Sequence, residues 1–271
     1  MPDLQTRQCY ARELIAALRP IRLGDRRYQA DSPAWFGERL FGGHVVAIAV
    51  AAAMTDTGSP HPPNSLHGYF LRPVEPRKIV TATVDTVRTG RSFSTYEVRL
   101  SQDEQVKFVL LCQFHAPEEG PAYQPQRPDV VAPGEAEEQW RDGPFEVRAI
   151  GPTELREDGT YASTRRAWIR LLAPVPHDVV VTTALAAYVS DMTGNAFRPL
   201  SLDEWDGWTD ASLDHAVWFH RPLRVDDWML FDLHCLINQG GRSLVRGQMY
   251  DADGGLCLSM AQELLIRRTD R

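Results

Sequence analysis

The sequence predicts an α+β fold made of two tandem copies of one unit, in which an antiparallel sheet wraps around a single apolar helix. Three observations support this prediction. Short motifs recur in the same order in both halves of the 271-residue chain. Each half contains one segment that is apolar on all sides, as expected of a buried helix. Each of these segments is followed by stretches in which apolar and polar residues alternate, which is typical of strands.

The repeated motifs are short, and it is their shared order that indicates a duplication. The matched pairs are YFLRP (69–73) with WFHRP (218–222), GRS (90–92) with GRS (241–243), Asp56 with Asp191, and Gln113 with Gln262. One such pair could arise by chance, whereas an ordered set separated only by loop-sized insertions is much harder to obtain that way.

Each half should begin with a short strand and a buried helix and continue with four longer strands. We expect the helices at 43–56 and 182–191 and the opening strands at 22–29, 145–150 and 163–172. The longer strands are expected at 65–74, 79–88, 92–101 and 106–115, and then at 213–223, 229–237, 243–251 and 256–267. Glycine-containing turns separate these segments.

A segment rich in proline and glutamate separates the two copies and reads as a surface linker. We therefore expect an N-terminal unit at 1–118, a linker at 119–141 and a C-terminal unit at 142–271. The length of the linker still allows the two units to pack against each other.

The composition limits the classes of function. Hydrophobic residues make up 43% of the chain and charged residues 24%, as in a packed globular protein. The net charge of −7 argues against a nucleic-acid partner. The longest apolar run, Val45–Met54, is far shorter than the roughly 20 residues of a membrane helix. The start of the chain lacks a signal pattern and the four cysteines lack metal-type spacing, so we expect a cytoplasmic protein with no membrane, metal or cofactor.

Several segments resemble the type II acyl-CoA thioesterases (TesB-like), which have a double hotdog fold. These segments are FGGHVVAIAVAAA, LHGYFLRPVEP, RTGRSFSTYEV, SDMTG, SLDHAVWFHRP and AQELLIRR, and they span most of the chain from about Pro20 to Arg268. SLDHAVWFHRP is the most specific of them. His44 stands where many relatives have glutamine. The resemblance implies that acyl-CoA is the substrate and that an Asp, a Ser or Thr, and a Gln of the C-terminal hotdog carry out its hydrolysis.

Carried over motif by motif, the resemblance assigns catalysis to Asp191, Ser212 and Gln262. Asp191 would act as a general base, and burial would raise its pKa and make it a stronger base. Ser212 and Gln262 would fix the attacking water. The sequence has no GxSxG motif and no cysteine with a convincing partner, which favours direct attack by water over an acyl-enzyme. Each residue also has a plain structural interpretation, such as a helix end, a strand start or a buried amide with its partners.

Other residues near these motifs are less specific. Arg91 and Arg242 lie beside matching turns and could meet the phosphates of CoA, although a solvated role is the simpler interpretation for each. We expect structural roles for His215 and His220. Phe197, Trp205 and Trp208 could line an acyl tunnel or cover the core, and the sequence does not separate the two.

Two other functions and the oligomeric state stay open. The chain could bind acyl-CoA without hydrolysing it, or act as a hydratase. The hydratase is disfavoured because Asp214 and His215, as neighbours on a strand, should point to opposite faces. A homodimer or larger homo-oligomer is possible. The first copy keeps Asp56, Ser65 and Gln113 as an echo of the trio, but prolines interrupt the approach to Ser65. We therefore expect the first copy to be mainly structural.

Overall fold

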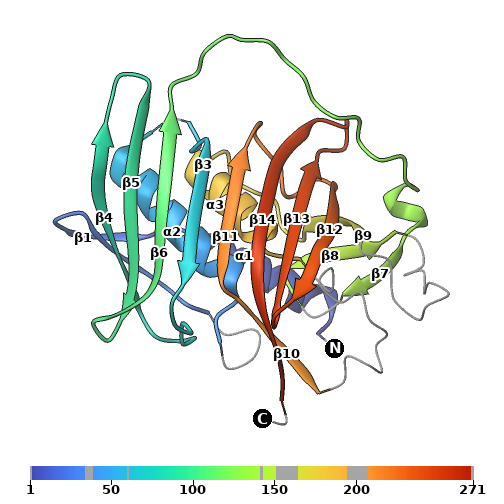
Figure 1. The fold of residues 1–271 in the computed structure, drawn as a ribbon, viewed down its shortest axis with the longest axis horizontal. Helices are drawn as coiled ribbons and strands as arrows, with labels where there is room; N and C mark the ends of the chain where they lie inside the picture. Colours follow the sequence, from blue (N-terminus) through green and yellow to red (C-terminus); the bar gives the residue numbers. More distant parts are fainter. Residues whose placement is uncertain are drawn as a thin grey trace.

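One continuous antiparallel sheet wraps around two central helices in the computed structural model (Figure 1). The structure describes residues 2–33, 39–59, 61–140, 143–150, 164–193 and 207–269. Within these residues the sheet has fourteen strands in the order β1-β2-β4-β5-β6-β3-β11-β14-β13-β12-β9-β8-β7, and β10 also pairs with β14. The α+β architecture predicted from the sequence is confirmed.

The elements of the first half include helix α2 and the strands that surround it. They are α1 (Leu4–Ala17), β1 (Ile21–Gly24), β2 (Arg27–Ala30), α2 (Gly42–Thr57), β3 (Ser65–Phe70), β4 (Val80–Thr89), β5 (Phe93–Gln102) and β6 (Gln105–His115). The second half surrounds helix α3. Its elements are the 3₁₀ turn η1 (Pro133–Glu135), β7 (Glu137–Trp140), β8 (Phe145–Ala149), β9 (Thr164–Leu171), α3 (Val179–Ser190), β10 (Trp208–Ser212), β11 (Asp214–Phe219), β12 (Met229–Gln239), β13 (Arg242–Tyr250) and β14 (Leu256–Arg268).

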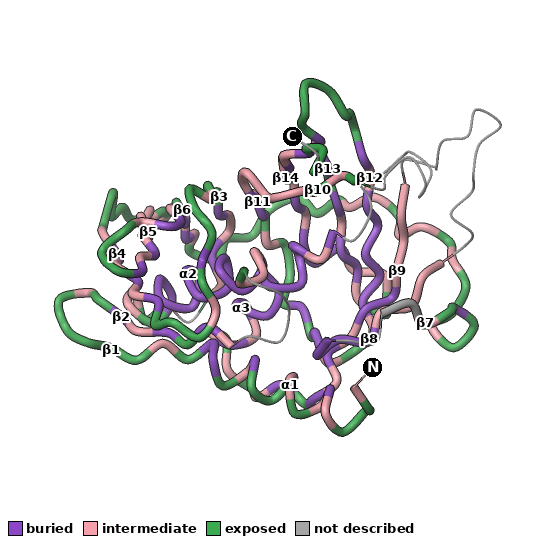
Figure 2. The backbone as a smooth tube through the Cα atoms, turned by 90° about the horizontal axis from the view of Figure 1, so that it is seen from below, coloured by how far each residue is buried: buried purple, intermediate pink, exposed green. Residues whose placement is uncertain are grey.

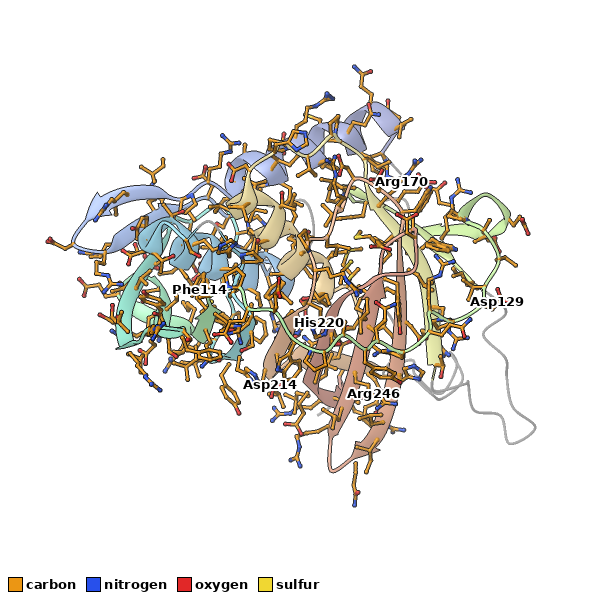
Figure 3. All side chains as sticks on the ribbon, turned by 90° about the horizontal axis from the view of Figure 1, so that it is seen from above. Phe114, Asp129, Arg170, Asp214, His220 and Arg246 are labelled. Carbon is orange, nitrogen blue, oxygen red and sulfur yellow. The ribbon has the colours of Figure 1, made fainter. Side chains whose placement is uncertain are left out.

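The two halves join along β3 and β11, which carry the repeated YFLRP and WFHRP motifs. These strands pair antiparallel from Ser65–Trp218 to Tyr69–Asp214. Asp214 and His220 accordingly lie near the middle of the molecule, with Phe114 in the first half on one side and Arg246 in the second half on the other (Figure 3). The paired motifs thus build the seam at which two similar sheets become one.

Helices α2 and α3 form the buried centre, as the burial colouring of the backbone shows (Figure 2). In α2 every residue from Gly43 to Met54 is buried, which explains why its apolar side chains surround the axis. The two helices approach closely enough that a Cβ built on Gly43 would lie 2.3 Å from the carbonyl oxygen of Tyr188. The start of α2 therefore packs against the end of α3, and glycine permits this contact.

Capping residues define the C-terminal end of α2 and the N-terminal end of α3. Helix α2 ends at Gly58, whose φ of +62° is readily adopted by glycine, the usual residue at this position. Helix α3 begins at Asp178, whose carboxylate accepts the backbone N–H groups of Val180 and Val181. Among the described residues no helix is both long and apolar enough to cross a membrane.

The structure differs from the sequence-based prediction at four places. The expected strand at 22–29 is a hairpin, β1–β2, which turns at Asp25 and Arg26 with φ of +46° and +58°. Helix α1 was not predicted, although its buried side chains recur every three or four residues. Strand β10 was not predicted either, and β7 lies within the segment expected to be a linker. Of the expected strand 163–172, the first residue lies outside the described part.

Helix α1 comes first in the chain but packs against the second half. Its buried Arg7 donates from Nη2 to the carbonyl of Phe145 at 2.8 Å and from Nε to the carbonyl of Gly143 at 3.2 Å. It also forms an ion pair with Glu138 at 2.9 Å. A buried guanidinium is stable only when such partners satisfy it. Arg7 therefore ties the first element of the chain to β7 and β8.

Replacing Gly43 by alanine should destabilise the protein, because the added methyl group meets the backbone of α3. We expect a loss of about 1–3 kcal/mol in the free energy of unfolding, measured by urea denaturation. Gly134→Ala is the control, since no atom lies within 4 Å of a Cβ at that position. Equal stability of the two variants would contradict the close packing of α2 and α3.

Candidate active site

Asp191 lies at the C-terminal end of α3, where it faces the N-terminal end of α2. Its side chain is buried, and its carboxylate accepts the backbone N–H of Gly43. A Cβ on Gly42 would lie 2.7 Å from Oδ2 of Asp191 and 3.2 Å from the ring of Phe70. The free N–H groups at a helix N-terminus favour a negative charge. The two glycines of the FGG motif therefore leave room for the carboxylate of Asp191 beside the backbone N–H groups of α2. A side chain at Gly42 would occupy that space.

Gln262 joins the other two residues of the predicted trio. It is fully buried on β14, and its Nε2 donates to Oδ1 of Asp191 and, at 3.0 Å, to Oγ of Ser212. Both amide protons are used in this way, which fixes the orientation of the amide. Ser212 accepts from Gln262 and keeps its own proton for another acceptor. The structure thus brings the three predicted residues together.

Ser212 faces inward because of a β-bulge between β10 and β11. Ser212 pairs with Leu264 and Ala216 pairs with Ala261, so four residue steps on one side match three on β14. Without the extra residue, Ser212 and His215 would point to opposite faces of the sheet. The bulge turns both toward α3, as bulges beside active sites often do.

Asp214 stabilises this bulge from the outer face. Its Oδ1 accepts the backbone N–H of Glu263 at 2.7 Å, while the N–H of Leu213 donates to the carbonyl of Glu263 at 2.9 Å. The carbonyl of Leu213 in turn accepts the N–H of Phe70 at 3.0 Å. Each of the four residues at the SLDH part of the motif therefore has a defined structural position. The serine and histidine face the helix, and the residues between them shape the bulge.

Burial raises the pKa of Asp191 to about 7. The hydrogen bonds from Gln262 and Gly43 act in the opposite direction, and the charge of Asp210 adds to the rise. A base is most effective when its pKa lies near the working pH, because it is then both ionised and basic. The direction of this shift agrees with the one expected from the sequence.

The structure does not bring the apparent echo of the trio in the first half together in the same way. Asp56 accepts from Nε of Arg26 at 2.9 Å and from the hydroxyl of Tyr28 at 2.9 Å. Of the neighbours Cys112 and Gln113 on β6, Cys112 is buried and faces inward. Gln113 faces outward, where Asn64 donates to its amide oxygen at 3.2 Å. The matching of Gln113 with Gln262 was therefore wrong by one residue. Phe70 pairs with Phe108 and Phe219 pairs with Leu258, so the offset between the copies is 149 on β3 and β11 but 150 on the last strand of each copy.

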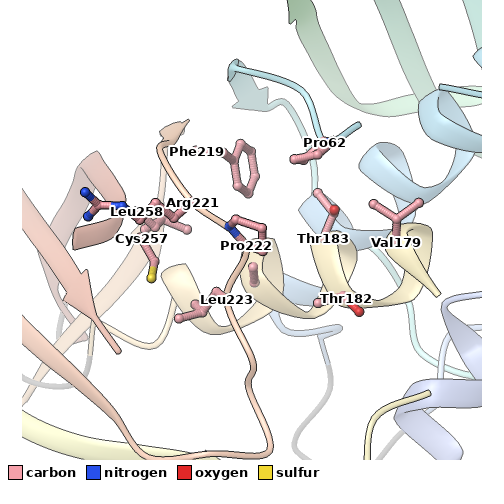
Figure 4. Close-up of a pocket in the computed structure, with 11 residues that line it drawn as sticks. Pro62, Val179, Thr182, Thr183, Phe219, Arg221, Pro222, Leu223, Cys257 and Leu258 are labelled. Carbon is pink, nitrogen blue, oxygen red and sulfur yellow. The ribbon is translucent and has the colours of Figure 1, made fainter. Parts of the chain in front are cut away.

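An apolar pocket of about 210 Å³ lies at the opposite end of α3 from Asp191 (Figure 4). Phe219, just after the WFHRP tryptophan, lies against it beside Val179 at the start of α3. Phe70 holds the equivalent place beside Gly42 at the start of α2. The pocket is thus the first copy's counterpart of the active site. It is lined without a carboxylate, as its residues show: Pro62, Val179, Thr182, Thr183, Ala186, Phe219, Arg221, Pro222, Leu223, Cys257 and Leu258.

The turn between β4 and β5, which contains Arg91, and the start of β13, which contains Arg242, lie at opposite ends of the sheet (Figure 1). Arg242 begins β13 and pairs with Leu265, which on its other side pairs with Ala211 next to Ser212. Its Nε forms an ion pair with Glu263 at 2.8 Å. Arg91 is exposed at the turn between β4 and β5, at the end that holds the apolar pocket. Only Arg242 lies at the same end of the sheet as Asp191.

Three aromatic residues were candidates for an acyl tunnel. Trp208 lies at the start of β10, where the guanidinium of Arg268 lies 5.3 Å from its ring centre. Phe197 and Trp205 lie outside the described residues. Within the described part of the chain, no group of three or more His, Cys, Asp or Glu side chains is placed to hold a metal ion.

Comparison with known proteins shows the family of the chain. Residues 31–115 match the family described as acyl-CoA thioesterase N-terminal domain, and residues 139–265 match the family described as acyl-CoA thioesterase. Rat acyl-coenzyme A thioesterase 8 is 30% identical, over 86% of this chain and 82% of the relative. Acyl-CoA thioesterase 2 of Haemophilus influenzae is 29% identical, over 94% and 96%. The crystal structure of acyl-CoA thioesterase II TesB2 from Mycobacterium marinum shares 30% identity and superimposes with a TM-score of 0.84, covering 94% of this chain and 98% of that one.

Fold and relatives together define a thioester hydrolase of the double hotdog type. The chain belongs to the acyl-CoA thioesterase family. The predictions of the fold and of the TesB-like family are confirmed. Sequence reasoning missed Gly42 and Gly43 as part of the site, although the FGG motif before an apolar helix was visible. It left open whether His215 faces the site and favoured a structural role for it, because a bulge leaves no clear signal in the sequence.

The raised pKa of Asp191 predicts two linked effects of pH. The value of kcat/KM should rise with pH through an apparent pKa of about 7 and then level off, because only the ionised carboxylate acts as a base. Since the pKa of Asp191 is higher in the folded chain than in the unfolded chain, the folded chain binds an extra proton at pH values between these two pKa values. The contribution of Asp191 to stability should therefore fall as pH rises through this window.

Asp191→Asn tests the second effect by removing the titration. We expect the stability difference between variant and native chain, from urea denaturation at about pH 5 and pH 8, to favour the variant at the higher pH. If the difference between the two proteins is the same at both pH values, Asp191 does not titrate as inferred.

Proposed function

We propose that this chain hydrolyses acyl-CoA by direct attack of a water molecule that Asp191 deprotonates. The observation that carries this proposal is the amide of Gln262, which holds both Asp191 and Ser212 at the glycine start of α2. A carboxylate, a hydroxyl and an amide converge there in a buried place. The hydroxyl of Ser212 is hydrogen-bonded to the amide of Gln262, which cannot act as a base for a serine nucleophile, and this supports water as the nucleophile.

The reaction follows from the positions of these groups. The water oxygen attacks the thioester carbonyl carbon while one of its protons passes to the carboxylate of Asp191. The tetrahedral intermediate then expels the CoA thiolate, which receives that proton from Asp191. The products are a fatty acid and CoA with a free thiol. No covalent bond between substrate and enzyme forms in these reaction steps.

The developing oxyanion needs hydrogen-bond donors in place before the reaction. We assign this role to the hydroxyl of Ser212 and to the first turn of α2, where the backbone N–H of Gly42 precedes the first bond within the helix. Preorganised donors of this kind are typically worth a factor of about 10²–10³ in kcat each. Gly42 thus allows the close approach of the carboxylate and could supply a donor to the substrate.

The first copy acts as structural support in this proposal. Its aspartate, Asp56, is held by Arg26 and Tyr28, and Cys112 takes the inward position that Gln262 holds in the second copy. It nevertheless contributes the N-terminus of α2 to the active site. Hydrolysis at one place therefore needs both copies, one for the trio and the other for the helix end.

We also propose a cytoplasmic location and a homo-oligomeric state. The four cysteines are free thiols, three of them buried, which suits a reducing compartment. On the outer face of the sheet Tyr69, Leu111 and Trp218 are exposed and come from the adjacent strands β3, β6 and β11. Exposed aromatic and aliphatic side chains grouped in this way support association of two chains through the sheet.

Asp191→Asn should abolish hydrolysis, whereas Asp56→Asn should not. We expect kcat to fall by about 10²–10⁴-fold in the first variant, as for loss of a general base, and to stay within about twofold in the second. The assay is release of CoA from acyl-CoAs of graded chain length, followed with a thiol reagent. Protection of the native chain by acyl-CoA against thermal unfolding, without any release of CoA, would instead show a non-hydrolytic binding protein.

Arg242→Ala should raise KM for acyl-CoA without a comparable change in kcat, since we propose that Arg242 meets the CoA phosphates. An exposed contact of this kind predicts an effect of about 2- to 10-fold that weakens with added salt. Arg91→Ala is the matched control, because Arg91 lies beside the equivalent turn at the other end of the sheet. This role would be contradicted if KM rose equally in both variants or if it rose in neither.

A further inference from the structure

His215 is buried beside the trio and has an unused nitrogen that faces it. Its side chain lies on β11 one residue beyond the pair Ala216–Ala261, so it stands opposite Gln262 on β14. The distance from Nδ1 of His215 to Oδ1 of Asp191 is 3.9 Å. The bulge at Leu213 gives His215 this position, since it turns His215 and Ser212 to the same inner face.

The other nitrogen of the ring is held by Ser190. Nε2 of His215 lies 2.8 Å from Oγ of Ser190, and the same hydroxyl donates its single proton to the carbonyl of Ala187 at 2.8 Å. Ser190 must then accept from His215, which places the ring proton on Nε2 and leaves a lone pair on Nδ1. Burial also lowers the pKa of His215 to about 3, so the ring is neutral at physiological pH.

Two buried acceptors consequently face the same small region. Among the described residues, Nδ1 of His215 and Oε1 of Gln262 have no hydrogen-bond partner. An unsatisfied buried acceptor costs about 1–3 kcal/mol, which a purely structural residue would avoid. Nδ1 of His215 lies 3.9 Å from Oδ1 of Asp191, and the amide of Gln262 is hydrogen-bonded to the same carboxylate, which is itself an acceptor when ionised. The group therefore calls for a small molecule that can donate more than one hydrogen bond, and water is the smallest.

We propose that His215 positions the attacking water, with Nδ1 accepting one of its protons while Asp191 accepts the other. Two acceptors bridged by one water through ordinary hydrogen bonds lie roughly 4–5 Å apart, close to the separation of Nδ1 and Oδ1. This arrangement leaves a lone pair of the water oxygen free to attack the thioester carbonyl. Ser190 takes part by fixing the ring proton on Nε2. The inference rests on the hydrolysis proposed above.

Two substitutions of His215 separate this role from a structural one. His215→Asn keeps a carboxamide at the place of Nδ1, and His215→Gln reaches toward Ser190 in place of Nε2. A structural role would be rescued by glutamine, because the bond to Ser190 would persist. A positioning role would be rescued by asparagine. His67→Asn is the control, since His67 is exposed on the outer face of β3, against Trp218.

The kinetic test compares kcat and KM of these variants for one acyl-CoA. We expect His215→Gln to lower kcat by about 10²-fold with KM within about twofold, as for a misplaced nucleophile. His215→Asn should retain at least ten times more activity than His215→Gln, and His67→Asn should match the native chain. Higher activity in the glutamine variant, or equal activity in both, would overturn the proposal. Absence of hydrolysis by the native chain would overturn the proposed function itself.

A measurement on the native chain does not depend on the folding of any variant. Nitrogen-15 NMR of the imidazole rings distinguishes a protonated nitrogen from one with a lone pair. The proposal requires the proton of His215 on Nε2 and the lone pair on Nδ1, and Ser190→Ala should weaken that preference. A native spectrum with the proton on Nδ1 would exclude His215 as an acceptor for the attacking water.

Discussion

The contact between the start of α2 and the end of α3 is the constraint on which the rest of the site depends. At this contact Gly43 allows the two backbones to approach, and the carboxylate of Asp191 accepts a hydrogen bond from the backbone N–H of Gly43. The helix N-terminus offers partial positive charge while the apolar surroundings remove water. These two effects oppose each other in the pKa of Asp191, and burial outweighs the hydrogen bonds. A carboxylate can therefore be both buried and reactive at this place.

This contact also underlies the proposal of one active centre in a duplicated chain. The approximate twofold relation between the copies would place a second centre at the start of α3. That place holds an apolar pocket lined by Val179 and Phe219 in place of a glycine slot, and Asp56 at the end of α2 is bound by Arg26. The paired strands β3 and β11 carry similar motifs and form the seam of the sheet, whereas the surroundings of the helix ends differ between the copies.

Much of this architecture could be predicted from the sequence. The helices α2 and α3 and the long strands have strong periodic patterns, and Asp191, Ser212 and Gln262 lie in motifs of a family. The positions of side chains relative to the two faces of the sheet could not be predicted where the strand pairing shifts. A single extra residue near Leu213 reverses which side chains face inward. For this reason the sequence did not decide whether His215 faces the site, and a structural role was expected for it. Gln113 was matched with Gln262 because the offset of the YFLRP and WFHRP motifs was applied to the last strand, where the offset is one residue larger.

The central claim is that water attacks the thioester directly at the centre formed by Asp191, Ser212 and Gln262. Rapid quenching of a single turnover, followed by mass spectrometry of the intact protein, tests this claim most directly. The account predicts that the protein keeps its native mass at every time point while fatty acid and CoA appear together. A transient increase in mass equal to the acyl group, located at Ser212 or any other residue, would contradict it.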